Sequence, residues 1–351
     1  MPGFSIVPFA VIDMDERRIR QEFELVQDSM ARYGLTLHET WLVQANLKAF
    51  VWRVRTDQGW KALKWIGRKK DKAIFSIYAH RHMEEAGFPV SPITLSRKGE
   101  LFLTHGNRIG FLTDWIDGQS PVREVDEHWR LYIKTLCDFH RTSEGFQVPQ
   151  GVRLKSKLGG WPLDYRNKIG HLRHWYEEAE GKSDSYFRLY RDVIPGVIRQ
   201  AEALFEQLVN SHYWAWVEEL AVRPTLCHSD YGETNTIMTG SDAMWVIDLD
   251  TVTFDLPVRD LRKVFESYLD PGIDLAAALG RIIDTYTEFV PLPQEKLEVF
   301  LIDVQFPYKV YQNAKYAFRH NVLDAAELTE EAELDLARAD AVRRYLGIAP
   351  V

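Results

Sequence analysis

The sequence has few cysteines, and this excludes one large class of proteins. The 351-residue chain contains two, Cys137 and Cys227, and both sit in apolar patterns. Two cysteines do not make a disulfide framework, so a small secreted scaffold is excluded. We expect both to be buried small hydrophobic residues and the chain to be made in a reducing cytosol.

Long apolar runs and an excess of positive charge are also absent. No run of about twenty apolar residues occurs, so no membrane span is predicted. The apolar patch at residues 4–12 is interrupted by Pro8 and follows no basic region, which makes it a poor signal peptide. The formal net charge of −8 argues against a nucleic-acid-binding surface. Neither a membrane nor a nucleic acid is therefore an expected partner.

The first third of the chain has a β-rich pattern. An amphipathic helix is predicted at residues 15–32 and a second helix at 71–85. The predicted strands are residues 40–44, 49–55, 60–66 and 109–115, with a hairpin at 95–103. Residues 117–121 read as a break, which predicts a domain boundary between residues 117 and 118.

The remainder reads as mainly helical. One apolar face is predicted around residues 129–140. Further helices are predicted at residues 164–179, 185–208, 261–269, 274–289, 295–319 and 329–345. The fold class is therefore α+β, with a first lobe at residues 1–117 and a helical lobe at residues 118–351.

One segment inside the helical part carries chemistry. Asp230 is followed five residues later by Asn235, and Asp248 ends a short apolar run that reads as a strand over residues 244–249. A strand–turn–strand ribbon would bring Asn235 and Asp248 together. One carboxylate for an attacking hydroxyl, plus an amide and a carboxylate for Mg²⁺, is what phosphoryl transfer requires. We therefore predict Asp230 as the base and Asn235 and Asp248 as metal ligands.

The same segment resembles a known group of enzymes. His-Ser-Asp at residues 228–230, Asn235 and Ile-Asp-Leu-Asp at residues 247–250 resemble the catalytic and metal loops of the aminoglycoside phosphotransferase-like kinases. Residues 53–64, 113–118 and Leu-Pro-Val-Arg-Asp-Leu-Arg at residues 256–262 are similar to the CotS spore-coat family within that superfamily.

This resemblance implies a bilobal protein-kinase-like fold, use of ATP with Mg²⁺, and a small hydroxyl-bearing acceptor. It also implies adenine recognition by backbone groups of a hinge at Asp114 to Ile116, and association with the spore coat after cytoplasmic synthesis.

Lys64 is the predicted phosphate contact, because strand alternation puts Ala62 and Lys64 on one face. Two family features are missing around it. The following helix has no glutamate near residues 74–77, and its own glutamates, Glu84 and Glu85, stand at the far end. We expect both to lie at a solvated helix end.

The loop at residues 44–49 also lacks glycine, and Ser229 stands where the family commonly has glycine. This leaves Asn46 and Lys48, or backbone amides, to contact phosphates.

Four further residues are interpreted structurally. We expect His228 to fix its loop and His140 to be a core histidine. Asp260 is expected either to accept backbone N–H groups of the catalytic loop or to cap the next helix. Asp250 shares a side with Asp248 if the strand continues, and is either a second metal contact or a bystander.

Two functions remain open from the sequence. The first is an ATP- and Mg²⁺-dependent small-molecule kinase, which Asp230, Asn235 and Asp248 favour. The second is a non-catalytic, kinase-fold component of the spore coat, which the missing glutamate and glycine favour.

Overall fold

The computed structural model describes residues 4–6, 16–45, 49–67, 70–270 and 272–348. The chain divides into two compact units, and the first is discontinuous in sequence. It contains residues 1–155 together with residues 233–252, and the second unit contains residues 156–232 and 253–351. No helix among the described residues is long and apolar enough to cross a membrane.

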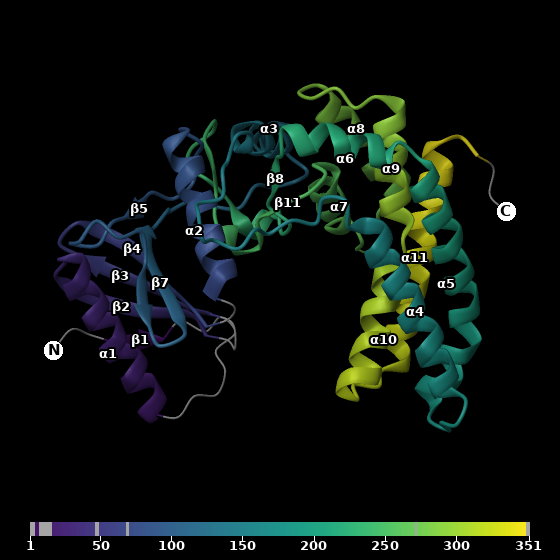
Figure 1. The fold of residues 1–351 in the computed structure, drawn as a ribbon, viewed down its shortest axis with the longest axis horizontal. Helices are drawn as coiled ribbons and strands as arrows, with labels where there is room; N and C mark the ends of the chain where they lie inside the picture. Colours follow the sequence, from purple (N-terminus) through teal and green to yellow (C-terminus); the bar gives the residue numbers. More distant parts are fainter. Residues whose placement is uncertain (1–3, 7–15, 46–48, 68–69, 271, 349–351) are drawn as a thin grey trace. The chain divides into compact units, whose positions relative to one another are not determined.

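A seven-stranded sheet forms the frame of the first unit (Figure 1). Its strands are β1 (Phe4–Ile6), β2 (Leu37–Ala45), β3 (Ala49–Thr56), β4 (Gly59–Ile66), β5 (Ile93–Thr94), β6 (Leu103–His105) and β7 (Arg108–Asp114). They follow the order β1-β2-β3-β4-β7-β5, and β6 also pairs with β7. β1 is parallel to β2 and the other pairs are antiparallel.

Alternation along the central strands separates the two faces of this sheet. Trp52 and Leu63 are fully buried on the face that packs in one cluster with Leu25 and Met30 of helix α1 (Glu16–Tyr33). Helix α2 (Lys70–Glu85) contributes to a separate cluster with residues of β4, β5 and β7. Helix α3 (Asp126–Ser143) completes the helices of this unit.

A ribbon from much later in the chain belongs to the same unit. It contains a 3₁₀ turn η1 (Glu233–Asn235), strands β9 (Thr236–Met238) and β10 (Met244–Val246), and a second turn η2 (Leu249–Thr251). Met238 exchanges backbone hydrogen bonds with Gln119 at 2.8 and 3.2 Å, and the Val246 N–H donates to the Pro89 carbonyl at 2.8 Å. These bonds fix the ribbon to the segments that flank the sheet.

The second unit is mainly helical. Its helices are α4 (Trp161–Ala179), α5 (Ser185–Asn210), α6 (Tyr213–Val222), α7 (Val258–Glu266), α8 (Leu275–Thr287), α9 (Gln294–Gln305), α10 (Tyr308–His320) and α11 (Ala325–Tyr345). Figure 1 shows α4, α5, α10 and α11 as long neighbouring helices, and their apolar residues form one core cluster. Strands β8 (Leu226–Cys227) and β11 (Thr253–Phe254) pair antiparallel in the same unit.

A buried ionic network holds α7 inside this unit. Asp303, fully buried on α9, accepts hydrogen bonds from the hydroxyls of Tyr165 at 2.9 Å and Tyr308 at 2.7 Å. Arg259 and Arg262 of α7 approach the same carboxylate at 3.4 and 3.0 Å. Burial alone would raise the pKa of Asp303, but the two guanidinium groups and the two hydroxyls lower it below its ordinary value.

The α+β class and most predicted elements agree with the structure, but two local predictions are wrong and one helix was missed. The hairpin at residues 95–103 is absent, since β5 and β6 each pair with β7. There the Ser96 hydroxyl accepts the N–H groups of Lys98 and Glu100, which favours a turn over a strand. The helix at residues 295–319 is broken at Pro307, because proline restricts the preceding Phe306 to an extended conformation. Helix α6 was not predicted.

We predict that Asp303→Ala lowers the free energy of unfolding of the whole chain by about 3–5 kcal/mol, because two arginines lose their buried counter-ion. Because the folded-state pKa of Asp303 is lowered, this contribution is present above the ordinary aspartate pKa of about 3.9 and is lost as pH falls through the lower folded value. Urea unfolding measures it.

Asp340→Ala is the matched control, because Asp340 pairs with Arg343 at 3.4 Å with its side chain 39% exposed. That change should cost less than about 1 kcal/mol. Equal losses in the two variants would contradict the structural importance of the buried network.

Candidate functional site

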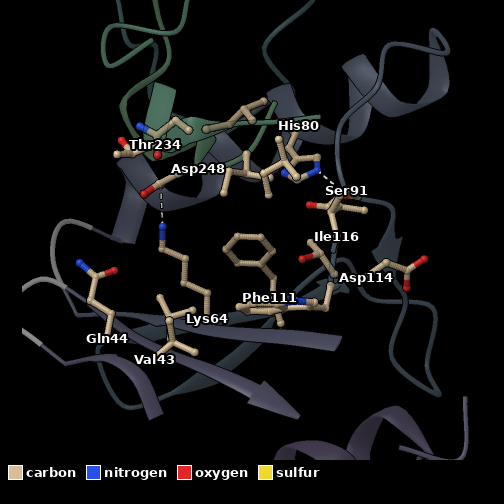
Figure 2. Close-up of a pocket in the computed structure, with 18 residues that line it drawn as sticks. Val43, Gln44, Lys64, His80, Ser91, Phe111, Asp114, Ile116, Thr234 and Asp248 are labelled. Atoms are coloured by element: carbon tan, nitrogen blue, oxygen red, sulfur yellow. Dashed lines mark hydrogen bonds and ion pairs between the residues drawn. The ribbon is translucent and has the colours of Figure 1, made fainter. Parts of the chain in front are cut away.

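A cavity of about 320 Å³ lies wholly within the first unit. Figure 2 shows the side chains that surround it. Five of the residues predicted from the sequence line it: Lys64, Asp114, Ile116, Asn235 and Asp248. The sixth, Asp230, belongs to the second unit. The structure therefore gathers the predicted nucleotide and metal residues in one cavity.

Lys64 reaches this cavity because of its register in β4. It lies opposite Val51 of β3, and both line the cavity together with Ala62. Lys64 Nζ lies 2.7 Å from Asp248 Oδ1 and 2.7 Å from Asp250 Oδ2. Burial alone would lower the pKa of Lys64, but the carboxylates of Asp250 and Asp248 raise it above its ordinary value. The side chain is therefore a held ammonium ion at neutral pH.

The backbone at Asp248 explains how two carboxylates meet one lysine. β10 ends at Val246, and Asp248 adopts a left-handed conformation with φ of 59° before η2 begins. The Ile247 N–H donates to the Asn235 carbonyl at 3.0 Å, which places Asn235 beside this turn. Asp248 and Asp250 do lie on one side, at Lys64, as expected, but they are not on a continuing strand. A turn, with an uncommon backbone conformation at Asp248, brings them together.

No glutamate of α2 contacts Lys64. Glu84 accepts the Ile93 N–H at 3.1 Å and pairs with Arg81 at 3.2 Å. Glu85 pairs with Arg81 at 2.8 Å with its own side chain 61% exposed. Glu85 lies at a solvated helix end as expected, whereas Glu84 ties the end of α2 to β5.

Sequence reasoning missed His80, a buried residue of α2 that lines the cavity. Its Nε2 lies 2.7 Å from the Ser91 carbonyl, which can only accept, so Nε2 carries the proton. Burial lowers the pKa of His80 to about 4, and the charge of Lys64 acts in the same direction. His80 is therefore neutral at pH 7 and contributes shape rather than charge.

The hinge candidate lies where β7 ends. The carboxylate of Asp114 pairs with Lys61 of β4, so the side chain of Asp114 is engaged within the sheet. The Trp115 Nε1 donates to Asp117 at 2.9 Å, and Arg53 donates to the same oxygen at 3.1 Å. The Arg53 guanidinium also lies 4.8 Å from the Trp115 ring centroid. These contacts fix the indole of Trp115, a residue that lines the cavity.

The predicted catalytic loop is held by α7 within the second unit. The N–H groups of His228 and Ser229 each donate to the Asp260 carboxylate at 2.7 Å, which confirms the first of the two roles expected for Asp260. Asp230 follows, with Oδ1 3.2 Å from Nζ of Lys263. No sequence pattern pointed to Lys263. Ser229 has φ of 66°, a left-handed conformation that glycine adopts without strain.

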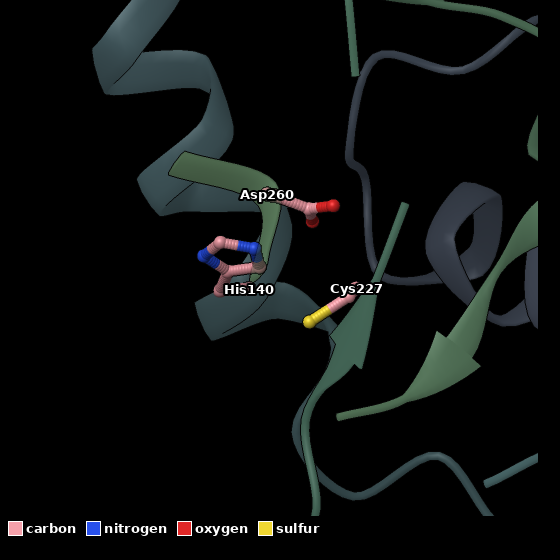
Figure 3. Close-up of side chains that lie close together, drawn as sticks. All are labelled: His140, Cys227 and Asp260. Atoms are coloured by element: carbon pink, nitrogen blue, oxygen red, sulfur yellow. The ribbon is translucent and has the colours of Figure 1, made fainter. Parts of the chain in front are cut away.

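Cys227 precedes this loop on β8 and is fully buried, as expected (Figure 3). Burial raises the pKa of its thiol, and the charge of Asp260 raises it further. Cys227 is thus an unreactive core residue rather than a nucleophile. His140 is also buried, as expected. The loop residues Asn46 and Lys48 lie outside the described residues.

Residues 41–291 of the chain match the phosphotransferase enzyme family. The chain belongs to that family. The match includes every residue predicted for the site, from Lys64 to Asp248.

Relatives of this chain fall into two groups. It is 25% identical to spore coat protein S of Bacillus subtilis strain 168 over 292 residues, which is 82% of each chain. Among solved structures, it resembles an aminoglycoside phosphotransferase from Alicyclobacillus acidocaldarius with a TM-score of 0.69 and 17% identity, covering 92% of this chain and 94% of that one. It also resembles a spectinomycin phosphotransferase in complex with ADP and spectinomycin, with a TM-score of 0.62 and 14% identity, covering 90% and 98%. These structures confirm the predicted kinase-like fold.

Gly118 has a steric role beside the cavity. A Cβ atom there would collide with the Met238 carbonyl oxygen and lie 2.6 Å from Cγ2 of Ile237, a residue that lines the cavity. A side chain at residue 118 would therefore displace β9 and strain the backbone hydrogen bonds between Gln119 and Met238.

We predict that Gly118→Ala destabilises the chain by about 1–3 kcal/mol, as overpacking against backbone does. Thermal unfolding measures the loss. Gly170→Ala in α4 is the control, since nothing lies within 4 Å of the added Cβ and alanine favours a helix. If Gly118→Ala matched Gly170→Ala in stability, the close approach of residue 118 to β9 would be refuted.

Proposed function

We propose that this protein is a kinase that transfers the γ-phosphoryl group of ATP to a hydroxyl of a small molecule. One observation carries the proposal: Lys64, Asn235 and Asp248 line a single cavity, although they come from distant parts of the sequence. An ammonium for phosphates beside amide and carboxylate oxygens is a combination that phosphoryl transfer requires and that core packing does not. Membership in the phosphotransferase enzyme family supports the same conclusion.

The nucleotide would occupy the cavity with its base near Trp115 and its phosphates near Lys64. Backbone groups from Asp114 to Ile116 would recognise adenine, because the side chain of Asp114 is already paired with Lys61. The lysine ammonium is a compact charge suited to the α- and β-phosphates. The ADP in the structure of the spectinomycin phosphotransferase supports nucleotide use by this fold.

The donor atoms also fit Mg²⁺. The amide of Asn235 and the carboxylate of Asp248 are hard oxygen donors that line one cavity, and Mg²⁺ takes one or two protein oxygens together with phosphate oxygens. The strained backbone at Asp248 supports a functional assignment for this residue. When bound, the ion would neutralise charge on the phosphates.

In the proposed reaction, the acceptor oxygen forms a bond to the γ-phosphorus and the bond between that phosphorus and the ADP oxygen breaks. The acceptor proton passes to the carboxylate of Asp230, and ADP leaves with the electron pair. The backbone around Asp230 is fixed by Asp260, so the base is held before the acceptor arrives.

We predict that Asp230→Asn lowers turnover by about 10²–10⁴-fold, the usual contribution of a general base, while ADP affinity stays within a factor of about three. Steady-state kinetics and calorimetry with ADP give the two values. Asp242→Asn, at an exposed turn, is the control and should be neutral. Full turnover in the Asp230 variant would refute the base assignment.

A second prediction concerns the metal. Mg²⁺–ATP should raise the melting temperature, since a ligand at ten times its Kd stabilises the folded state by about 1.4 kcal/mol. In Asp248→Ala the stabilisation should no longer depend on Mg²⁺, and in Lys64→Met it should be smaller. A thermal-shift series with ATP, ADP and GTP, each with and without Mg²⁺, measures all three. No stabilisation by any nucleotide at millimolar concentration would refute the kinase proposal.

The similarity to spore coat protein S favours a second candidate function, a non-catalytic coat component with a kinase fold. Association with the spore coat, after synthesis in the cytoplasm, would belong to that function. The absence of a glutamate partner for Lys64 on α2 also favours it. Stabilisation by nucleotide without phosphoryl transfer to any of a broad panel of acceptors would support this function over the first.

A further inference from the structure

Lys64 forms ion pairs with Asp248 and Asp250. Only Asp250 can remain fully paired with the lysine once Mg²⁺ and the nucleotide are bound. If Asp248 binds Mg²⁺, as proposed above, it can no longer neutralise Lys64 to the same extent. The exposed fractions of the side chains are 40% for Asp248, 29% for Asp250 and 12% for Lys64. They agree with Asp248 as the metal ligand and Asp250 as the lasting partner of Lys64. Asp250 is the more enclosed carboxylate, and it touches the lysine at 2.7 Å.

The main chain of Asp250 is anchored to the helix that would ordinarily supply a glutamate. The Ser76 hydroxyl of α2 donates to the Asp250 carbonyl at 3.0 Å. Lys155 Nζ donates to the same carbonyl at 2.9 Å and to the Ser76 hydroxyl at 3.0 Å. Lys155 also lies 5.5 Å from the ring centroid of Phe75 on α2. Two side chains, Ser76 and Lys155, therefore hold the turn that carries the Asp250 carboxylate.

We propose that Asp250 replaces the missing helix glutamate as the positioning residue for Lys64, and that Ser76 and Lys155 fix Asp250 for this task. The proposal rests on the kinase function above. It removes the main structural objection to that function, because the lysine has a rigid counter-ion without any glutamate on α2. In this proposal one loop supplies both groups: Asp248 binds the metal, and Asp250, two residues later, positions Lys64.

A double-mutant cycle tests whether Asp250 acts through Lys64. Asp250→Asn should lower kcat by about 10²–10³-fold, the usual loss when one preorganised electrostatic group is removed. Lys64→Met should lower kcat by a similar factor. The double variant should be no slower than Lys64→Met alone, because a group that acts through the lysine has nothing left to position. Multiplicative losses in the double variant would overturn the proposal.

A binding measurement separates this role from metal ligation. In thermal shifts with ADP, the half-saturating Mg²⁺ concentration of Asp250→Asn should stay within a factor of about three of the unaltered chain. A tenfold or larger increase would make Asp250 a metal ligand and overturn the proposal. If the unaltered chain is not stabilised by any nucleotide, the kinase function itself fails, which is a different result from failure of the Asp250 variant alone.

The anchor has its own matched pair of variants. Lys155→Met should lower kcat several-fold, because the Asp250 carbonyl loses one of its two donors. Lys72→Met removes an exposed lysine of α2 one turn before Ser76 and should leave kcat unchanged. Equal kcat values for these two variants would refute the anchoring role of Lys155.

Discussion

The ion pairs of Lys64 with Asp248 and Asp250 are the interaction on which the first unit depends. They join β4 of the sheet to a turn that lies almost two hundred residues later in the sequence. The ammonium of Lys64 is largely enclosed, and two carboxylates compensate its loss of water, so its position depends on both the sheet and the turn. The left-handed backbone of Asp248 and the hydrogen bonds to the Asp250 carbonyl hold the two carboxylates at Lys64.

In the second unit, one short helix has a comparable role. α7 contributes Asp260 to the backbone of the predicted catalytic loop and Arg259 and Arg262 to the buried carboxylate of Asp303. The Pro-Val-Arg-Asp-Leu-Arg stretch thus has a physical explanation. Its aspartate binds the backbone of the predicted catalytic loop, and its two arginines bind Asp303 in the helical core. Its arginines pair with buried carboxylates, and the buried carboxylate of Asp260 accepts two backbone N–H groups.

Much of the frame could be predicted from sequence because its strands and helices have clear periodicity. The face on which Lys64 lies followed from alternation, and the burial of Cys227 followed from its apolar pattern. For Asp260 the sequence left two roles open, and the structure selects one. The counter-ion of Lys64 could not be predicted, because it depends on a left-handed residue and a 3₁₀ turn that have no periodic signal. His80, Lys155 and Lys263 were missed because their importance comes from contacts between segments distant in sequence. The hairpin failed because a serine hydroxyl competed for the backbone amides.

The discontinuity of the first unit bears on how the chain is made. The ribbon that carries Asn235 and Asp248 is hydrogen-bonded to Pro89 and Gln119, but the whole stretch from Ser156 to Gly232 is synthesised in between. Proteins fold from the N-terminus as they emerge from the ribosome. All strands of the sheet are synthesised before that interval, so Lys64 leaves the ribosome long before either of its carboxylates does. The cavity can be complete only after residues 234–249 have also been made.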